Sequence, residues 1–564
     1  MKNFLLLFSL ICIPSVLLAQ GGVDVNVAAN GQMYISKTAF VYVDNGGDVN
    51  INATGELIMD SDSQNFSNLY VDGASTGSAE YKRFTASAAV SRDIIAAPVH
   101  GEAFNTFYAR NMSSIAAGTQ PEQAGDFLFG TYDNTSVSGQ YQESLSTDTY
   151  TLDAGTGYRA GTTDAVGETL SFKGDVTTTD VVVPITYAGL YSGSSSIRFP
   201  ETNLIGNPYT TNISADQLLD VMIADATDII DDEYTYIYGY DADVTGTDGA
   251  TWTRIDKMYL TTLGTDVNIA PGQGFIVYAK DNYGFGTPLA GTLTFNKSMR
   301  TVAPATDDFI AGRNAANSAT TATNIIANFQ LQIENNSNSK TYNTNLFFLD
   351  NNASRGLDIS WDAGDKTIPA FGIATLLAED TLGKGTPFTN QVLEANDLSN
   401  VSSSVVIPVY VNASAGQSYT IRIDEVSNLT GGSIYLEDTV TNTVTLLNNN
   451  DYTFTPAADL VGAGRFYLRT NSSSSLSTEE NTFSALNIKS ILNAKTLKIE
   501  GQLNSKTQLS LYDVAGRLIN TYTLNADAQL SERFIDVSSV SEGVYVAKLT
   551  NNSNQTKSDK IIIK

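Results

Sequence analysis

Short runs of about four to seven Val, Ile, Tyr, Phe and Thr residues recur along the whole chain, separated by clusters of Gly, Asn, Asp and Ser. Runs of this length and composition are typical of β-strands, and the clusters between them are typical of turns. Apolar residues at helical spacing are scarce. A chain of 564 residues has the length of about three to four domains. We therefore predict an all-β, multidomain protein with little helix.

One segment departs from the strand pattern. Residues Ser214 to Gln217 match a capping box, in which a Ser side chain and a Gln side chain satisfy the first backbone groups of a helix. The apolar residues that follow are Leu218, Leu219, Val221 and Met222. The sequence predicts a helix that begins near Ser214.

Changes in composition divide the chain into blocks. From residue 22 to 80 the strands lie close together with Gly between them, which fits a short β-solenoid or the edge of a sandwich. Two stretches have little apolar periodicity, which predicts a linker at 301–324 and a spacer at 471–483. The predicted organisation is a signal peptide at 1–19, the short-strand block at 22–80, a β-rich region at 81–300, a linker at 301–324, a β-sandwich at 325–470, a Ser-rich spacer at 471–483 and a separate carboxyl-terminal module at 484–564.

The alternation expected of a half-buried strand is clearest in the block from 325 to 470. Tyr419, Ile421 and Ile423 would face inward, with Thr420 and Arg422 facing outward. Similar short strands follow one another with turns between them. This pattern favours a β-sandwich.

The amino terminus carries an export signal. Lys2 precedes an apolar stretch from Phe4 to Leu18, and the small residue Ala19 stands before Gln20. The stretch is too short for a membrane span, so it predicts a secretory signal peptide. Cleavage after Ala19 would remove Cys12, the one cysteine of the chain, and leave no disulfide. No later segment has the 18 or so consecutive apolar residues of a spanning helix.

The charge of the chain is strongly acidic and uneven. The net charge is −28, with one His in the whole chain. Such a field repels phosphate backbones, and the scarcity of His and Cys removes the usual ligands of zinc, haem and iron–sulfur clusters. Residues 484–564 hold ten basic and seven acidic residues, a net of +3. Once Lys2 is removed with the signal peptide, residues 20–483 therefore carry −32.

Three motifs near the carboxyl end carry a family resemblance. Residues 511–517, 543–549 and 560–564 read Leu-Tyr-Asp-Val-Ala-Gly-Arg, Gly-Val-Tyr-Val-Ala-Lys-Leu and Lys-Ile-Ile-Ile-Lys. Their order resembles the type A carboxyl-terminal sorting domain of the Bacteroidota type IX (Por) secretion system. The motif residues are Tyr512, Asp513, Gly516, Arg517, Gly543, Tyr545, Lys548 and Lys560.

The resemblance implies a route and partners. The signal peptide would take the chain through the inner membrane, and the sorting domain would direct it through the outer membrane. The expected partners are the type IX translocon and its processing machinery. Removal of the domain would leave the protein attached to the cell surface or released.

The middle region also has a resemblance. Residues 203–209, 272–277 and 295–300 are similar to blocks of large flavobacterial surface proteins that share this sorting domain. That family is secreted and β-rich, with no assigned activity. Asn207-Pro208 marks a turn, and Gly272 and Gly274 flank Gln273 where the backbone enters a buried strand. We interpret these residues as keeping the fold.

No residue set selects a catalytic site. His100 is the only imidazole base, and no Gly-x-Ser-x-Gly elbow accompanies it, so a turn histidine is favoured. A glycosidase needs only two carboxylates, but nothing in the sequence selects a pair. Of the large aromatic platforms that bind sugars, only Trp252 and Trp361 are indoles, although the 28 Tyr residues could substitute.

An acidic loop has the start of a calcium site. Asp241, Asp243 and Asp248 supply oxygen ligands, and Gly246 permits a sharp bend, but position twelve is Trp252 and not the closing Glu. An exposed acidic turn is favoured over a dedicated site. No cofactor is expected, apart from weakly bound Ca²⁺ that would relieve the repulsion among the carboxylates.

Three functions remain open. The first is a non-catalytic surface or extracellular β-protein in adhesion or matrix interaction, the second a polysaccharide-binding surface module, and the third a carboxylate-dependent hydrolase. The expected location is the outer-membrane surface or the medium.

Overall fold

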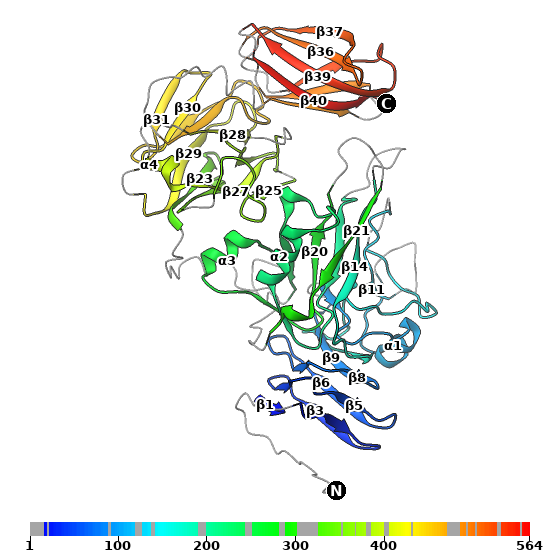
Figure 1. The fold of residues 1–564 in the computed structure, drawn as a ribbon. Helices are drawn as coiled ribbons and strands as arrows, with labels where there is room; N and C mark the ends of the chain where they lie inside the picture. Colours follow the sequence, from blue (N-terminus) through cyan, green and yellow to red (C-terminus); the bar gives the residue numbers. More distant parts are fainter. Residues whose placement is uncertain are drawn as a thin grey trace. The chain divides into compact units, whose positions relative to one another are not determined.

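The structure is a computed structural model, and it is built almost entirely of strands (Figure 1). It describes residues 16–19, 22–87, 92–118, 127–136, 141–189, 199–242, 251–280, 288–301, 325–350, 353–366, 368–379, 385–399, 405–429, 432–470, 486–491, 495–501, 503, 505–526, 532–552 and 555–563. Of the linker predicted at 301–324, residue 301 ends a short strand and residues 302–324 lie outside these ranges. The Ser-rich spacer at 471–483 and residues 1–15 of the predicted signal peptide also lie outside them. The predicted all-β, multidomain fold is confirmed.

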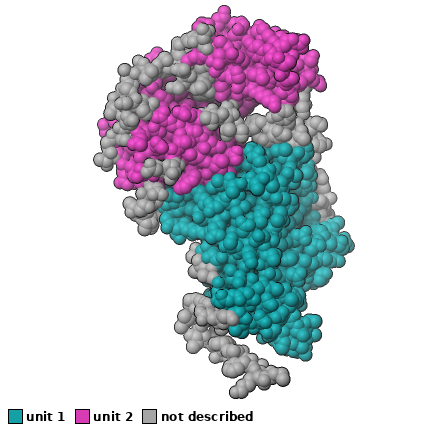
Figure 2. Space-filling view, in the orientation of Figure 1, with its two compact units in different colours: residues 1–231, 236–282, 286–318 teal, residues 232–235, 283–285, 319–564 magenta. Residues whose placement is uncertain are grey.

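The chain forms two compact units (Figure 2). The first contains residues 1–231, 236–282 and 286–318, and the second contains 232–235, 283–285 and 319–564.

The first unit begins with a parallel β-solenoid. Its strands are β1 (Val16–Ala19), β2 (Val25–Val27), β3 (Gln32–Ile35), β4 (Phe40–Val43), β5 (Val49–Ile51), β6 (Glu56–Asp60), β7 (Asn68–Val71), β8 (Ser75–Thr76) and β9 (Ala79–Thr85). They stack in three parallel ladders, β1-β4-β7, β2-β5-β8 and β3-β6-β9. Of the two arrangements that the sequence left open for this block, the structure has the solenoid.

A repeat of 24 residues underlies the first coils. Val25 pairs with Val49 and Gln32 pairs with Glu56, each 24 positions further on. Residues 24–35 and 48–59 are identical at five of their twelve aligned positions. Polar groups repeat with the coils, since the Asp48 amide donates to the Asp24 carboxylate and the Ala74 amide donates to that of Asp48. Each coil therefore supplies the hydrogen-bond acceptors of the next.

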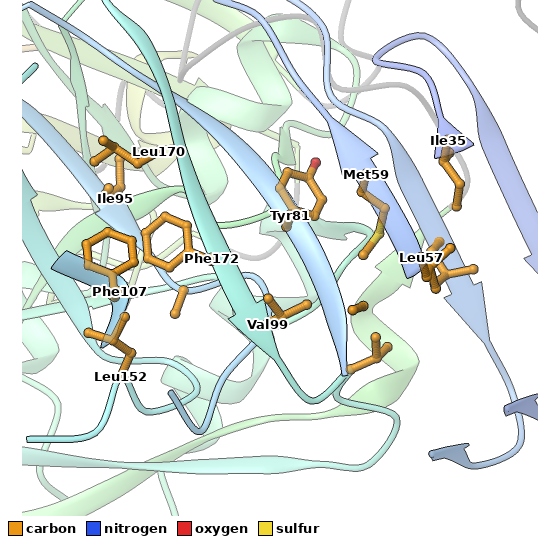
Figure 3. Packing of buried hydrophobic residues seen from close by; sticks show 14 of the residues in the cluster. Ile35, Leu57, Met59, Tyr81, Ile95, Val99, Phe107, Leu152, Leu170 and Phe172 are labelled. Carbon is orange, nitrogen blue, oxygen red and sulfur yellow. The ribbon is translucent and has the colours of Figure 1, made fainter. Parts of the chain in front are cut away.

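The solenoid core continues into the next layer without a break. Figure 3 shows Leu57, Met59 and Tyr81 in the same buried cluster as Phe107 and Phe172. The residue pair 80 and 81, where the sequence predicted a block boundary, lies inside β9. On its far side β9 pairs with β13 (Glu168–Gly174). The solenoid and the following region therefore share a strand and a core.

The rest of the first unit consists of small sheets and short helices. Its strands are β10 (Asp93–Ala96), β11 (Phe129–Gly130), β12 (Gly157–Ala160), β14 (Val181–Tyr187), β15 (Thr202–Gly206), β16 (Asn212–Ser214), β17 (Ile237–Asp241), β18 (Thr251–Ile255), β19 (Asn268–Ile269), β20 (Gly274–Tyr278), β21 (Leu289–Phe295) and β22 (Arg300–Thr301). The sheet that matters most below has the order β15-β20-β17-β18, with every pair antiparallel.

The helix predicted near Ser214 is present as α2 (Ala215–Ala224). The Ser214 hydroxyl accepts a hydrogen bond from the Gln217 amide at 3.1 Å, and Leu218, Leu219 and Met222 are buried. The unit also contains α1 (Phe104–Asn111), α3 (Lys257–Leu263) and the 3-10 turn Lys297–Met299, whereas a second 3-10 turn, Asp232–Tyr234, belongs to the second unit. The sequence did not predict these elements.

The blocks at 203–209 and 272–277, which the sequence indicated as keeping the fold, contain buried polar contacts and a close strand approach. The buried Asn207 amide donates to the carbonyls of Thr211, Ile269 and Ala270 at 2.9 to 3.0 Å. Gln273 accepts from the buried guanidinium of Arg83 at 2.6 Å and so links the start of β20 to β9. A Cβ at Gly274 would lie 2.5 Å from the Ile94 side chain, so β10 can approach β20 only over a glycine.

The second unit contains one continuous sheet of eleven strands. They are β23 (Ile325–Asn335), β24 (Lys340–Leu349), β25 (Ala363–Gly364), β26 (Gly372–Thr375), β27 (Phe388–Glu394), β28 (Val406–Asn412), β29 (Tyr419–Ser427), β30 (Tyr435–Asp438), β31 (Thr443–Leu446), β32 (Tyr452–Phe454) and β33 (Phe466–Arg469), with α4 (Ala395–Ser399) after β27. The strands enclose one buried cluster. Tyr419 and Ile421 lie in that cluster and Ile423 packs against it, as the alternation indicated.

Two further sheets complete the second unit. One has the order β34 (Asn487–Ile491), β35 (Thr496–Glu500), β38 (Glu532–Asp536). The other has the order β37 (Leu518–Leu524), β36 (Thr507–Asp513), β39 (Gly543–Asn551), β40 (Thr556–Ile563), again with every pair antiparallel. A single buried cluster lies between the two sheets.

Candidate functional site

The two faces of the sheet β15-β20-β17-β18 have opposite character. Side chains alternate between the faces along each strand, so residues two apart share a face. On one face Ile237, Ile255 and Phe275 are buried in the main core of the unit. The opposite face carries Tyr238 and Tyr240 of β17.

Aromatic residues from neighbouring segments gather on this second face. Trp252 of β18 pairs with Tyr240 of β17, and Tyr278 of β20 lies beside a small apolar floor of Ile94, Leu204 and Ile276. We call the whole set the aromatic face: Tyr132, Tyr141, Tyr236, Tyr238, Tyr240, Trp252 and Tyr278.

The rings on the aromatic face contact one another in a continuous series. The Trp252 indole stacks on Tyr238 with ring centroids 4.7 Å apart and an interplanar angle of 14°. The Tyr240 ring centroid also lies 4.7 Å from that of Trp252, at an interplanar angle of 47°. Trp252 keeps 38% of its surface exposed. A stacked, solvent-facing indole of this kind offers a flat apolar surface.

Two guanidinium groups lie over tyrosine rings of the face. Arg159 lies 4.4 Å from the Tyr141 ring centroid, and Arg254 lies 5.4 Å from that of Tyr236. Each also has a carboxylate at 3.6 Å, Glu143 for Arg159 and Asp256 for Arg254. The charges at the aromatic face are therefore balanced locally, within a body that is strongly negative.

Burial sets the protonation of several groups here. It raises the pKa of Tyr132, Tyr141 and Tyr278 above the ordinary value for a phenol, so these hydroxyls remain neutral hydrogen-bonding groups. Burial lowers the pKa of Arg159. Its Nε and Nη2 atoms are buried and have no hydrogen-bond partner among the described residues. A ligand oxygen that reached this guanidinium would satisfy them.

The residues of the predicted acidic loop do not come together in the described parts of the chain. Asp241 ends β17, whereas Asp243 and Asp248 lie outside the described residues. Trp252, which stands at the position where a calcium loop has its closing Glu, belongs to the aromatic face. Among the described residues, no group of three or more His, Cys, Asp or Glu side chains lies close enough together to hold a metal ion. The possible weak Ca²⁺ binding stays a prediction.

The other candidates lie apart from the aromatic face. The half-buried His100 forms an antiparallel bridge with Asp175 through its backbone, where the sequence favoured a surface turn. Trp361 lies in a turn closed by its amide, which donates to the Asp358 carbonyl.

The sorting-motif residues divide between the core and the surface of their sheet. The Asp513 carboxylate accepts from the Ala515 and Arg517 amides, and Gly516 has a φ of +78°, so these residues form a turn. Tyr545 is buried, and its hydroxyl donates to the Ser541 carbonyl. Gly543 begins β39. The remaining three residues, Tyr512, Lys548 and Lys560, lie on the outer face of the sheet.

The aromatic face was not predicted, although part of its signal is visible in the sequence. Tyr236, Tyr238 and Tyr240 alternate with other residues over five positions, which places three rings on one side of a strand. Tyr132, Tyr141 and Tyr278 come from distant segments, and only the folded sheet brings them together.

Comparisons with known proteins identify two regions. A family model described as Domain of unknown function (DUF8693) matches residues 15–469, and one described as Secretion system C-terminal sorting domain matches residues 493–564. No curated relative matches the chain. The second match confirms the predicted sorting domain. The chain is therefore a type IX secreted protein, exported to the cell surface or the medium, and its sorting domain interacts with the type IX machinery.

Solved structures give only distant similarities. A β-glucuronidase of Parabacteroides merdae is 13% identical, with 27% of each chain covered and a TM-score of 0.11. A polysaccharide lyase is 7% identical over 43% of this chain and 40% of that chain, with a TM-score of 0.12. Latent PorU from Porphyromonas gingivalis is 11% identical over 71% of this chain and 36% of that chain, with a TM-score of 0.15. The chain spans less than half the length of each, and at these TM-scores the similarities carry no argument.

The search for spanning segments gave one further result. Within the described parts of the chain, no helix has the length and apolarity needed to cross a membrane.

Proposed function

We propose that this chain, which belongs to the DUF8693 family and ends in a type IX sorting domain, is a non-catalytic surface protein that binds uncharged polysaccharide. The observation that carries the proposal is the aromatic face, where Trp252 stacks on Tyr238 and remains partly exposed. Adhesion to a carbohydrate matrix would follow from binding at this face.

The chemistry of the face suits a sugar ring. The C–H groups of a pyranose form apolar patches that stack on indole and phenol rings, while its hydroxyls need hydrogen-bonding groups around the edge. The phenols of Tyr132, Tyr141 and Tyr278, which are neutral at physiological pH, are hydrogen-bonding groups at this face. The tyrosine rings pack against the buried side chains of Ile94, Leu204 and Ile276, which fixes their positions.

Charge argues for an uncharged polymer. Residues 20–483 carry −32, which repels polyanions such as uronic-acid or sulfated chains. The two guanidinium groups at the face do not reverse this field, because Glu143 and Asp256 lie beside them. A neutral glycan meets no such repulsion.

The test measures binding of the purified chain to neutral polysaccharides, such as a soluble α-glucan and a soluble β-glucan, by affinity electrophoresis and calorimetry. We expect saturable binding that falls about tenfold or more in Trp252→Ala, equivalent to about 1.4 kcal/mol. The matched control is Tyr34→Ala, which removes a 54%-exposed ring from β3 of the solenoid, away from the aromatic face. Its affinity should equal that of the unsubstituted chain.

Two results would contradict the proposal. Equal loss of affinity in both variants, or no binding to any neutral polymer, would remove the assigned role of the aromatic face. Release of reducing ends during the incubation would show hydrolysis, and the protein would then be an enzyme acting through a carboxylate pair.

A further inference from the structure

The outer face of the sheet β37-β36-β39-β40 in the sorting domain is not uniform. Its inner face contributes Leu509, Leu511, Ala547 and Leu549 to the buried cluster. The alternate side chains point outward, and the strand register arranges them in rows that cross the sheet.

Two of these rows are polar throughout. One contains Thr521, Ser510, Lys548 and Ser558, and the next contains Thr523, Gln508, Thr550 and Thr556. Such residues are what a solvated sheet face requires.

The row nearest the turn at Asp513–Arg517 is different. Leu518 is opposite Tyr512, Tyr512 is opposite Val546, and Val546 is opposite Lys560. We call the first three residues the apolar row. Leu518 is 51% exposed and Val546 is 38% exposed.

Two neighbours enlarge this apolar surface. Val514, in the turn itself, is 80% exposed, and Ile519 is 37% exposed. None of these four aliphatic side chains belongs to the buried cluster of the domain. An exposed apolar cluster bordered by polar rows marks a surface that another protein covers.

We infer that the apolar row is the surface by which the sorting domain binds a protein of the type IX export machinery. The match of residues 493–564 to a sorting domain requires a surface on this domain that the machinery recognises. Tyr512 and Lys560, two of the motif residues, lie on the row and at its end. The other motif residues at the turn and in the core maintain the sheet that presents it.

The charge around the row defines the partner further. Lys560 ends the row and Lys548 lies in the neighbouring polar row, whereas Arg517 in the adjacent turn is paired with the Asp513 carboxylate. Residues 484–564 carry +3, in contrast with −32 on the rest of the exported chain. The complementary surface is therefore an apolar patch with acidic residues at its edge.

The test uses the full chain in a cell with a working type IX system and measures its distribution between periplasm and surface plus medium. Leu518→Glu combined with Val546→Glu should reduce the exported fraction about tenfold or more, because binding would bury both new charges. The matched control is Thr521→Glu with Thr523→Glu, which places two charges on the same outer face of β37 but in the polar rows. This control should be exported normally.

Stability and self-association are measured on the same proteins. If the Glu variant unfolds, export is measured instead for Leu518→Gln combined with Val546→Thr, since these substitutions remove apolar surface and keep the charge unchanged. Normal export of a folded apolar-row variant would overturn the inference. Loss of a dimer in ultracentrifugation with unchanged export would also overturn it, and would assign the row to contact between two copies. Polysaccharide binding should be the same in all variants, so a failure here is distinct from a failure of the proposed function.

Discussion

Two four-stranded antiparallel sheets of this chain each bury one face in a core but differ in the residues on the opposite face. In β15-β20-β17-β18 and in β37-β36-β39-β40, one face packs in a main core and the other carries a separate set of side chains. The first sheet uses its free face for stacked rings, with Trp252 and Tyr238 in contact. The second uses aliphatic residues, Leu518 and Val546, beside lysines.

The difference matches the two partners proposed above, a neutral glycan and a protein of the export machinery. Rigid rings lose little conformational freedom on binding and match the flat face of a sugar. Aliphatic side chains with a basic border match the irregular surface of another protein. The inner faces, in contrast, are similar, since both contribute aliphatic and aromatic residues to a buried cluster. Function in this chain is therefore to be sought on the outer faces.

The largest expected effects come from the inner faces, and they test whether the two sheets are independent. Phe275→Ala should lower the free energy of unfolding of the first unit by about 3–5 kcal/mol, and Leu511→Ala that of the sorting domain by about 2–5 kcal/mol. Both residues are fully buried. Thermal unfolding of the full chain, measured by calorimetry, should show that each substitution lowers the temperature of a different transition. A common shift of all transitions would mean that the sheets unfold together.

A smaller effect, the loss of stability at alkaline pH, is expected for the first of the two sheets only. Burial raises the pKa of Tyr132 and Tyr278 above the ordinary 10.0 of the unfolded chain. The neutral phenols therefore contribute stability that is complete below about pH 10 and is lost as the pH rises further. Phenolate absorbance during a pH titration should show these tyrosines ionising only as the first unit unfolds. Ionisation near pH 10 with the fold intact would contradict the burial of the aromatic face.

The smallest effect concerns acid and the sorting domain. Burial alone would raise the pKa of Glu500, but Lys489 and Lys498, each 2.9 Å away, outweigh it and hold the pKa below the ordinary 4.5. Its contribution to stability is present above pH 4.5 and is lost as the pH falls through the lowered pKa. Glu500→Gln should cost about 1 kcal/mol at neutral pH and flatten the acid limb of the stability curve. An unchanged acid limb would leave Glu500 without this role.

Much of the strand content could be predicted from the sequence because turn residues bound each strand. The helix α2 could be predicted since Ser214 caps it through its side chain, whereas α1 has no side-chain cap hydrogen bond at Ala103 and gave no such signal. The 24-residue repeat was present in the sequence but was not recognised among the short strands. The sorting domain was recognisable because its motifs are local in the chain.

The aromatic face was harder to predict for a physical reason. Alternation shows that Tyr236, Tyr238 and Tyr240 share a side of their strand, but not whether that side meets the core or solvent. In the structure, Ile237 and Phe275 occupy the opposite face and pack in the main core, so the tyrosines lie on the face away from it. The apolar row has the same origin, since only the pairing of β36 with β37 and β39 brings Leu518, Tyr512 and Val546 into line.

The 24-residue coil of the solenoid also makes the length of this molecule adjustable. The first two coils are related by a shift of 24 residues in all three ladders, and the Asp24 and Asp48 carboxylates both accept from the backbone of the following coil. A coil of this length could therefore be inserted between these two without changing their register. One insertion would lengthen the solenoid by about 4.8 Å, the spacing of adjacent strands. Relatives built on this plan could differ in reach while keeping the sheets described above unchanged.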